Sequence, residues 1–257
     1  MADAARTAIV TGAGSGIGQA VSHCLKDRGY TVITIDKVAS EHTDFVADLT
    51  RTEDIERVSA ALPEWDVLVH SAGVGTDAPP VLILGLNVVV PRILTQAIAG
   101  RAKHGAAVLG IASVAAQLSE FDEAIVSYAC GLELQDVAAF ADEHALTSPL
   151  AYRLSKEALL FWMRSEAASD APYRVNCVSP GPVATPMWDR VQTTAPDATA
   201  MLKDTLAEIP TAAQIAPAIV ELCSPNFFWV NGGNLPLDGG LGARLALKKK
   251  TELDVET

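Results

Sequence analysis

Two side chains, Tyr152 and Lys156, are spaced so that they could move a proton together. They are four residues apart, so on a helix that begins after Ser148-Pro149 both project from one face. A free phenol titrates near pH ~10, and a nearby ammonium group lowers that pKa by Coulomb attraction. The other three tyrosines have Thr34, Leu132 or Cys177 four residues on. Tyr152 is therefore the candidate general acid or base, with Lys156 beside it.

Ser113 and Asn87 are polar residues in apolar surroundings. Ser113 ends the apolar run 108–113, where its hydroxyl could hydrogen-bond a carbonyl oxygen as negative charge develops on it, or could simply form a turn. Asn87 interrupts the apolar run 84–90, and an amide in a buried helix needs hydrogen-bond partners. It is either a satisfied core asparagine or a water-holding link to Lys156.

A glycine-rich loop spans residues 11–18 and fits T-G-x-x-x-G-x-G, with Gly12, Gly16 and Gly18, whereas the G-x-G-x-x-G spacing fails. Such glycines allow a tight turn and the close approach of a pyrophosphate to a helix N-terminus. An ordinary flexible turn is the alternative interpretation.

Asp36 follows Gly18 by eighteen residues, at the end of a second apolar run. A carboxylate there can accept hydrogen bonds from adenosine ribose hydroxyls and repels a 2′-phosphate, which favours NAD over NADP. Lys37 beside it and Arg6 nearby weaken that preference, and Asp36 could instead cap a turn. Asp48, after another short extended segment, could reach the adenine amino group.

The elements that must position these residues alternate between short β-branched runs and longer stretches of helical period. The predicted strands are 8–11, 31–35, 67–70, 107–111 and 174–178, and the predicted helices include 16–28, 52–61, 86–101 and 152–168. The rhythm predicts an α/β fold, a doubly wound parallel sheet with helices on both faces. Ligands of such sheets bind outside the carboxyl ends of the strands.

The composition supports one globular domain. A net charge of −12 excludes a protein that binds nucleic-acid backbones, and no uninterrupted apolar stretch is long enough to span a membrane. The N-terminus carries no signal-peptide pattern, and four scattered cysteines suggest a reduced, cytoplasmic protein. We expect one domain over residues 1–247 and a solvated polar tail over residues 248–257.

Together these residues resemble the short-chain dehydrogenase/reductase family from about Ala8 to Gly240. The features that carry the resemblance are the glycine loop, Asp36, Asp48, Ala72-Gly73, Asn87, Ser113, Tyr152, Lys156, Pro180-Gly181 with Thr185, and Asp238-Gly239-Gly240. The resemblance implies a single-domain Rossmann-type fold, NAD as cofactor, and reversible hydride transfer between a secondary alcohol and a ketone. In it Tyr152 is the general acid/base, Lys156 lowers its pKa and holds the nicotinamide ribose, Ser113 polarises the substrate oxygen, and Asn87 supports a proton-relay water.

The resemblance also implies a set of cofactor-binding residues, with Val183 and Thr185 meeting the nicotinamide carboxamide and no metal. That set is Gly12, Ser15, Gly16, Ile17, Gly18, Asp36, Asp48, Leu49, Ala72, Gly73, Tyr152, Lys156, Pro180, Gly181, Val183 and Thr185.

The chain departs from the family pattern at His70-Ser71, where members usually carry two asparagines before Ala-Gly. The usual sheet-bridging hydrogen bonds are then in doubt, and we interpret His70 as scaffold rather than catalytic. Asn87 follows Gly73 by only fourteen residues, and Tyr152 follows Ser113 by 39, about three times the common spacing. The short loop and the acidic, helix-prone insert at 119–147 resemble the 3α-hydroxysteroid dehydrogenase/carbonyl reductase subgroup, in which the insert alters subunit pairing.

The expected substrate lid is the segment 186–209, where Met187 and Trp188, with Ser113, would face a bulky hydrophobic or hydroxysteroid-like substrate. A broad carbonyl reductase for small aliphatic or aryl ketones is the alternative enzyme. A dinucleotide-sensing binding protein would have a damaged Ser-Tyr-Lys-Asn set, and an acidic interaction module would use the insert.

We expect a cytoplasmic homodimer or homotetramer with a small-molecule alcohol or ketone as substrate, and neither nucleic acid nor membrane as partner.

Overall fold

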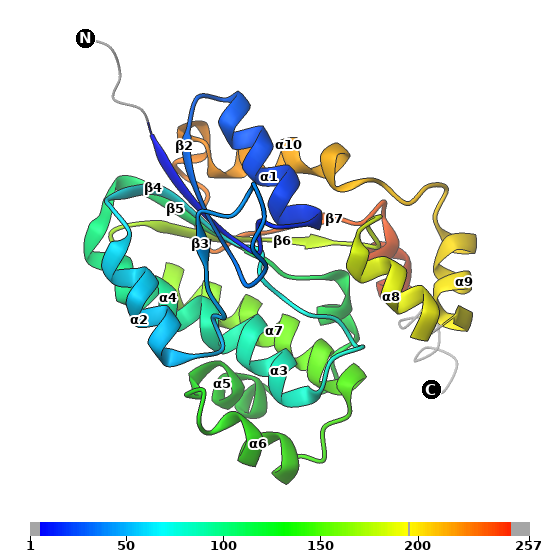
Figure 1. The fold of residues 1–257 in the computed structure, drawn as a ribbon. Coiled ribbons are helices and arrows are strands. Elements are labelled where there is room, and N and C mark those ends of the chain that lie inside the picture. The colour runs from blue at the N-terminus through cyan, green and yellow to red at the C-terminus, as the bar shows by residue number, and fades with distance from the viewer. Residues whose placement is uncertain (1–5, 195, 248–257) are drawn as a thin grey trace.

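A computed structural model describes residues 6–194 and 196–247 as one α/β domain around a parallel sheet of seven strands (Figure 1). The predicted tail, 248–257, lies outside the described residues. The strand order is β3-β2-β1-β4-β5-β6-β7, and the order reverses beside β1, where ligands of such sheets bind. The strands are β1 Thr7–Thr11, β2 Thr31–Asp36, β3 Phe45–Val46, β4 Trp65–His70, β5 Ala102–Ile111, β6 Arg174–Pro180 and β7 Asn234–Leu237. The predicted fold class is confirmed.

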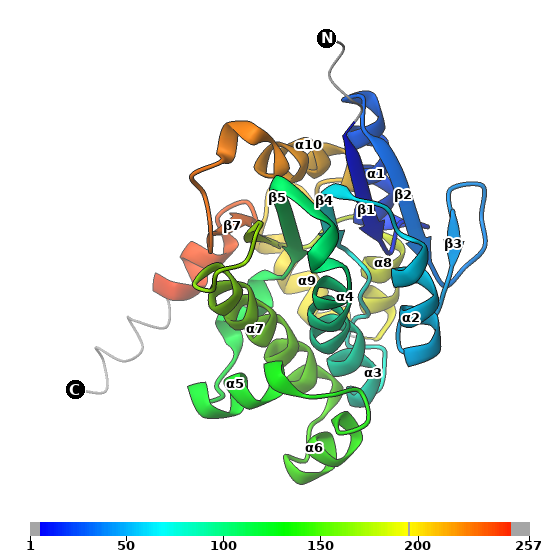
Figure 2. The ribbon, with the colours of Figure 1, turned by 90° about the vertical axis from the view of Figure 1, so that its left-hand side faces the viewer.

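Helices cover both faces of this sheet (Figures 1 and 2). One face carries α1 (Gly16–Asp27) and α10 (Ala212–Cys223), and the other carries α2 (Thr52–Ala61), α4 (Val90–Ile98) and α7 (Ser148–Ala167). Because side chains alternate along a strand, Ala8 and Val10 join the cluster under α1 and α10, whereas Ile9 joins the opposite cluster. Both faces are therefore buried, which explains why the strands read as continuous apolar runs.

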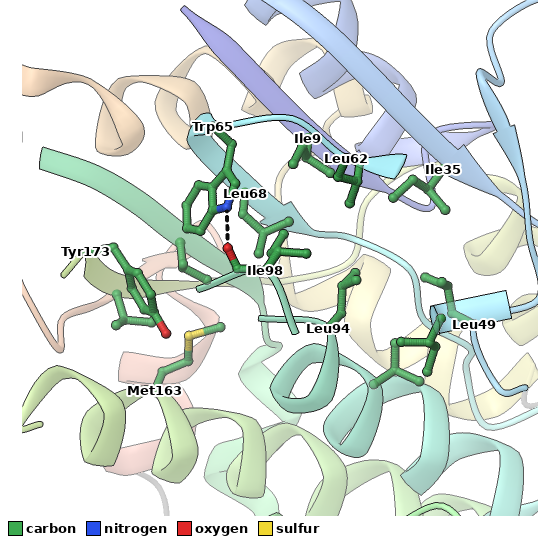
Figure 3. Packing of buried hydrophobic residues seen from close by; sticks show 14 of the residues in the cluster. Ile9, Ile35, Leu49, Leu62, Trp65, Leu68, Leu94, Ile98, Met163 and Tyr173 are labelled. Carbon is green, nitrogen blue, oxygen red and sulfur yellow. Dashed lines mark hydrogen bonds between the residues drawn. The ribbon is translucent and has the colours of Figure 1, made fainter. Parts of the chain in front are cut away.

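Figure 3 shows the larger core cluster, between the sheet and the second helical layer. Its largest fully buried side chain is Trp65, whose indole Nε1 donates a hydrogen bond to the Ile98 carbonyl at 3.0 Å. The bond satisfies the one polar atom of the ring and ties the start of β4 to the end of α4.

A single helical run extends from Pro80 to Arg101 and changes type along its length. It comprises α3 (Pro80–Leu84), a π-helical turn η1 (Gly85–Val89), α4 and the 3-10 turn η2 (Ala99–Arg101). The predicted start at Leu86 is wrong because Pro80 already occupies the first helical position, where a proline is well tolerated. By length and composition alone the run could cross a membrane, with a mean hydropathy of 1.8, but 61% of that window is buried inside the domain, as in a core helix.

The insert between Ser113 and Tyr152 is helical but is not one helix. It contains α5 (Glu123–Gly131) and α6 (Val137–Glu143), and the helical spacing seen from Leu132 onward becomes helix only from Val137. Asp122 caps α5 by accepting a hydrogen bond from the Ile125 amide at 2.9 Å. The insert buries its apolar side chains against α3 and α7, in a third core cluster (Figure 1).

The remaining differences from the predicted elements concern boundaries and short pieces. Several strands begin earlier or end later than predicted, α7 begins at Ser148, and the strands β3 and β7 were not predicted. The predicted lid forms α8 (Pro186–Thr194) and α9 (Pro196–Thr205), the short helices are η3 (Val114–Leu118) and η4 (Pro225–Phe227), and residues 241–247 are also helical.

Candidate active site

The glycine loop joins β1 to α1 at the carboxyl edge of the sheet, and its glycines are required by close backbone contacts. Gly12 has φ +68°, and a Cβ on it would lie 2.6 Å from the Ala72 backbone. A Cβ on Gly18 would lie 2.2 Å from the Gly12 carbonyl oxygen. Ser15 is the N-cap residue of α1. The unpaired backbone amides of the first helical turn, which includes Ile17, therefore lie next to the loop. The loop is therefore a narrow backbone cradle at a helix N-terminus, the arrangement that binds phosphate.

Thr11 and His70 form the hydrogen bonds around the end of β4, where the chain lacks the two family amides. The Thr11 hydroxyl oxygen accepts hydrogen bonds from the Ser71 and Ala72 amides at 3.2 and 3.1 Å, which joins β1 to the loop after β4. His70 Nε2 lies 2.7 Å from the Thr95 hydroxyl of α4. Burial lowers the pKa of His70 to about 3, so its ring is neutral at physiological pH. In this structure His70 contacts scaffold residues, in line with the scaffold interpretation.

Asp36 ends β2 and faces the glycine loop. Its Oδ2 accepts a hydrogen bond from the Gly14 amide at 2.9 Å, and its Oδ1 accepts one from the Val38 amide at 3.0 Å. The carboxylate thus caps the local turn and also stands beside the loop that would hold a pyrophosphate. Arg6 precedes β1 and accepts a backbone bond from the Thr31 amide, so it lies at the opposite, amino end of the two strands. The expected interference of Arg6 with Asp36 is therefore wrong.

Asp48 and Leu49 follow β3 and differ in what their side chains do. Leu49 is buried in the core, 4% exposed, so its side chain cannot face a ligand. Asp48 is exposed, and its Oδ1 accepts hydrogen bonds from the Thr50 amide at 3.0 Å and the Thr50 hydroxyl at 2.6 Å. Its proposed contact with adenine would use the other carboxylate oxygen.

Tyr152 and Lys156 lie on the first turns of α7, as their spacing predicts. Lys156 is 7% exposed, its Nζ donates to the Ile111 carbonyl at 2.9 Å, and it stands 5.6 Å from the centroid of the Tyr152 ring. Burial lowers the pKa of Lys156 to about 8. Burial also raises the pKa of Tyr152, and a hydrogen bond with Ser113 acts in the opposite direction. The pKa of Tyr152 is therefore raised overall and not lowered, because desolvation of the phenolate dominates.

Ser113 stands at the N-cap of η3, directly after β5, and its hydroxyl oxygen accepts a hydrogen bond from the Ala115 amide at 3.2 Å. It is thus both a turn former and a partner of Tyr152. The two readings of Ser113 from the sequence are compatible.

Asn87 lies on the π-helical turn and is 1% exposed. Its Oδ1 accepts from the Val74 amide at 3.0 Å, and its Nδ2 donates to the Val74 carbonyl and to the Ser155 hydroxyl, each at 3.1 Å. Ser155 and Val74 were missed from the sequence, although the signal for Ser155 was present as a polar residue on the inner face of α7.

Gly73 leaves room between Asn87 and Lys156. A Cβ on Gly73 would lie 3.0 Å from Asn87 Oδ1 and 3.9 Å from Lys156 Nζ. The missing side chain therefore lets the Gly73 backbone lie close to both the amide oxygen and the ammonium group.

The segment after β6 is the last part of the site at the carboxyl edge of the sheet. Gly181 follows Pro180 and donates to the Leu237 carbonyl at 3.1 Å, while Val183 is buried in the core, so only its main chain can face a ligand. Thr185 accepts a hydrogen bond from the Trp188 amide at 3.3 Å, and its methyl group lies 3.3 Å from where a Cβ on Gly16 would be. Thr185 thus stands against the glycine loop.

The lid helix α8 contacts the loop after β4. The Met187 side chain lies against Gly75, where an added Cβ would be 3.2 Å from Met187 Cγ. Arg190 Nε donates to Asp77 Oδ2 at 2.7 Å, and Trp188 is half-buried. Met187 is therefore over the loop that carries Gly73, as expected of a residue near the substrate.

The residues present fit a nicotinamide dinucleotide. The glycine loop offers a backbone cradle that any Cβ at Gly12 or Gly18 would fill, and Asp36 stands beside it. At the other end, Lys156 forms no ion pair among residues 6–194 and 196–247, so a buried positive charge faces the edge without a carboxylate. An elongated anionic ligand with hydroxyl groups matches this arrangement.

Comparisons with known proteins give the same result. The family described as "NAD dependent epimerase/dehydratase family" matches residues 8–122, and the one described as "Enoyl-(Acyl carrier protein) reductase" matches residues 134–242. The coniferyl-alcohol dehydrogenase of Pseudomonas sp. (strain HR199 / DSM 7063) is 31% identical over 255 residues, which cover 91% of this chain and 96% of that protein. The chain belongs to the short-chain dehydrogenase/reductase family and is an alcohol/carbonyl oxidoreductase that depends on a nicotinamide cofactor.

Two relatives belong to the subgroup that the insert resembles. The 3-alpha-hydroxysteroid dehydrogenase/carbonyl reductase of Comamonas testosteroni is 28% identical over 252 residues, covering 91% of this chain and 96% of that protein. The crystal structure of the 3-alpha-hydroxysteroid dehydrogenase from Pseudomonas sp. B-0831 complexed with NADH superposes with a TM-score of 0.83 at 27% identity, covering 94% of this chain and 99% of the other.

Proposed function

We propose that this protein is an NAD(H)-dependent dehydrogenase that interconverts a secondary alcohol and a ketone, with Tyr152 as general acid/base. The observation that carries the proposal is the meeting of Tyr152, Ser113 and Lys156 at the same edge of the sheet as the glycine loop and Asp36. A proton donor and an anion cradle are then parts of one site.

The reaction needs one hydride transfer and one proton transfer. A bound nicotinamide dinucleotide would supply the hydride acceptor for oxidation of the alcohol and the hydride donor for reduction of the ketone. Tyr152 takes the hydroxyl proton during oxidation and gives it back to the developing alkoxide during reduction. The raised pKa of Tyr152 keeps its phenol protonated at neutral pH, which suits the acid role in ketone reduction.

Ser113, Lys156 and Asn87 would assist the proton transfer by Tyr152. The Ser113 hydroxyl acts on the phenol in the direction of a lower pKa and would hold the substrate oxygen beside it. The Lys156 ammonium would bind the hydroxyls of the nicotinamide ribose, and its charge favours the phenolate once the site is closed to water. The space over Gly73 would hold a water molecule between Asn87 Oδ1 and Lys156, through which the proton leaves.

Asp36 supports NAD over NADP. Its carboxylate is held by the Gly14 amide beside the glycine loop, where its charge would repel a 2′-phosphate, and Arg6 lies at the far end of the strand. Lys37 is exposed and adjacent, so the preference rests on the Asp36 charge.

For the substrate we propose a bulky hydrophobic alcohol or ketone, with Met187 and Trp188 of α8 as walls. The relatives named for coniferyl alcohol and for 3α-hydroxysteroids support this class. The name carbonyl reductase in the second relative supports the alternative, a broad reductase of small aliphatic or aryl ketones. A cytoplasmic location and a homodimer or homotetramer stay predictions.

The test is an initial-rate screen with NAD(H) and NADP(H) against hydroxysteroids, coniferyl alcohol, acetophenones and small aliphatic ketones. We expect turnover of a hydrophobic substrate, and a fall of about 10²- to 10⁴-fold in kcat for Tyr152→Phe with NADH affinity retained. Full turnover by Tyr152→Phe would contradict the proposed mechanism.

A further inference from the structure

Ser155 is a buried hydroxyl next to the catalytic pair. It lies on α7 between Tyr152 and Lys156 and is fully buried, 0% exposed. Its Oγ donates a hydrogen bond to the Tyr152 carbonyl at 2.8 Å and accepts one from Asn87 Nδ2 at 3.1 Å. A serine in a helix often donates to a carbonyl of the preceding turn, so the second bond is the informative one.

That second bond exhausts the donors of Asn87. A primary amide has two N–H donors, and Asn87 uses one on the Val74 carbonyl and the other on Ser155. Its Oδ1 accepts from the Val74 amide, which fixes the orientation of the amide group. Oδ1 keeps one lone pair free, and it lies 3.0 Å from where a Cβ on Gly73 would be, with Lys156 Nζ 3.9 Å from the same point.

Three segments far apart in the chain meet at this amide: the loop after β4 through Val74, the π-helical turn through Asn87, and the catalytic turn of α7 through Ser155. Removing the Ser155 oxygen would leave a buried N–H of Asn87 without a partner, and this is costly for any buried polar group. The amide would then turn or shift, and its link to the main chain of Tyr152 would be lost.

We propose that Ser155 is a positioning residue for the proposed reaction: it couples Asn87 to the catalytic turn and so holds Tyr152 and Lys156 in register with Gly73 and Val74. The inference rests on the proposed function, and it extends the Asn-Ser-Tyr-Lys set by a fifth side chain that contacts neither substrate nor cofactor. Ser165, on the same helix, gives the contrast. It donates to the Phe161 carbonyl at 3.1 Å and is exposed, and within residues 6–194 and 196–247 no hydrogen bond joins its side chain to a second element.

The experiment compares Ser155→Ala, Ser155→Thr and the matched control Ser165→Ala in the full chain. For Ser155→Ala we expect kcat to fall about 10- to 100-fold, since small displacements of reacting groups cost this much, while KM changes little. Ser155→Thr keeps the hydroxyl and should restore most of kcat. Ser165→Ala should keep the wild-type kcat. If Ser155→Ala does not fold, Ser155→Cys, whose thiol is a weak acceptor of similar shape, replaces it.

A second readout needs no turnover. In the proposed site ADP would contact only the Asp36 half of the cradle, whereas NADH would also reach Lys156, so calorimetric titrations should show weaker NADH binding to Ser155→Ala and unchanged ADP binding. A general loss of structure would weaken both ligands together. Unchanged kcat and an unchanged NADH-to-ADP affinity ratio in Ser155→Ala, or a folded Ser155→Thr that fails to restore kcat, would overturn the proposal. If the wild type binds NADH but turns over no alcohol or ketone, the proposed function fails, and the affinity ratio still tests Ser155.

Discussion

The Lys156 ammonium lies 5.6 Å from the centroid of the Tyr152 ring, yet the two side chains respond to burial in opposite directions. Burial lowers the pKa of Lys156 to about 8 and raises the pKa of Tyr152, because it disfavours the charged form of each. Near neutral pH the lysine is therefore charged but close to its titration, and the tyrosine is neutral.

The first prediction concerns pH. Lys156 carries its charge below about pH 8 and loses it above, so NADH affinity should fall as the pH rises through about 8. For stability the sign is fixed by the depressed folded-state pKa: the burial of the charged group costs stability below pH 8, and that cost disappears as the pH rises toward the unfolded value of 10.5. NADH fluorescence titrations between pH 6.5 and 10 measure the affinity. Lys156→Met should bind NADH weakly and without this pH dependence, and an equal dependence in that variant would assign it to another group.

The second prediction concerns the choice of dinucleotide. We expect the wild type to bind NADH more tightly than NADPH, and Asp36→Asn to reduce that discrimination by about tenfold, because the neutral amide no longer repels a 2′-phosphate. Asparagine keeps an oxygen acceptor for the Gly14 amide, so the loop should stay intact. Lys37→Gln is the matched control and should change the ratio little. Tighter NADPH binding by the wild type would refute the assignment.

The third prediction concerns acid stability. His70 is buried and neutral, with a pKa of about 3 in the folded protein against 6.5 in the unfolded chain. As the pH falls below 6.5, the unfolded chain takes up a proton that the folded protein does not, so the stability that His70 contributes is lost. Between pH 6.5 and 5 this single group should account for about 2 kcal/mol. His70→Gln can still reach Thr95 and should flatten that part of the curve, whereas His104→Gln, at an exposed site, should not. Urea unfolding at several pH values gives the comparison, and parallel curves for wild type and His70→Gln would rule the effect out.

The fourth prediction concerns the lid. The Arg190–Asp77 ion pair, at 2.7 Å, joins α8 to the loop after β4 beside the Met187–Gly75 contact. Because Arg190 is half-exposed, the pair should be worth under about 1 kcal/mol and should weaken with salt. Asp77→Asn should therefore speed NADH release by a few fold at low ionic strength, measured by stopped-flow fluorescence. The Arg28–Glu221 pair lies away from the lid, so Glu221→Gln serves as control, and equal effects of both variants would argue against a latch.

Residues close together in the chain were predictable, and residues brought together by the fold were not. The Tyr152–Lys156 spacing, the glycine loop and the strand-end position of Asp36 are local patterns, and the structure places all three at one edge. The strand β7 escaped prediction because four residues that include a proline give no alternating pattern. The pKa direction of Tyr152 depends on how deeply the ring is buried, which no spacing reveals.

The hydrogen-bond partners of buried polar residues also could not be predicted from the sequence. Asn87 stood out as an amide among apolar residues, but its partner Ser155 is 68 residues away and is one of many serines in helices. Thr95, the partner of His70, and the bridging Thr11 were missed for the same reason. The sequence can indicate that a buried polar residue needs a hydrogen-bond partner, but it does not identify that partner.

The amide of Asn87 also has a consequence for how the protein acquires activity. Its bonds join residues 13 and 68 positions apart, so only a fragment that spans Val74 to Ser155 contains all three pieces of the site. Contacts of such long range form only after costly loop closure, so they belong to the late stage of folding. After denaturant is diluted, the return of dehydrogenase activity should then lag behind the recovery of the helical circular-dichroism signal. Activity would therefore measure the completion of tertiary structure.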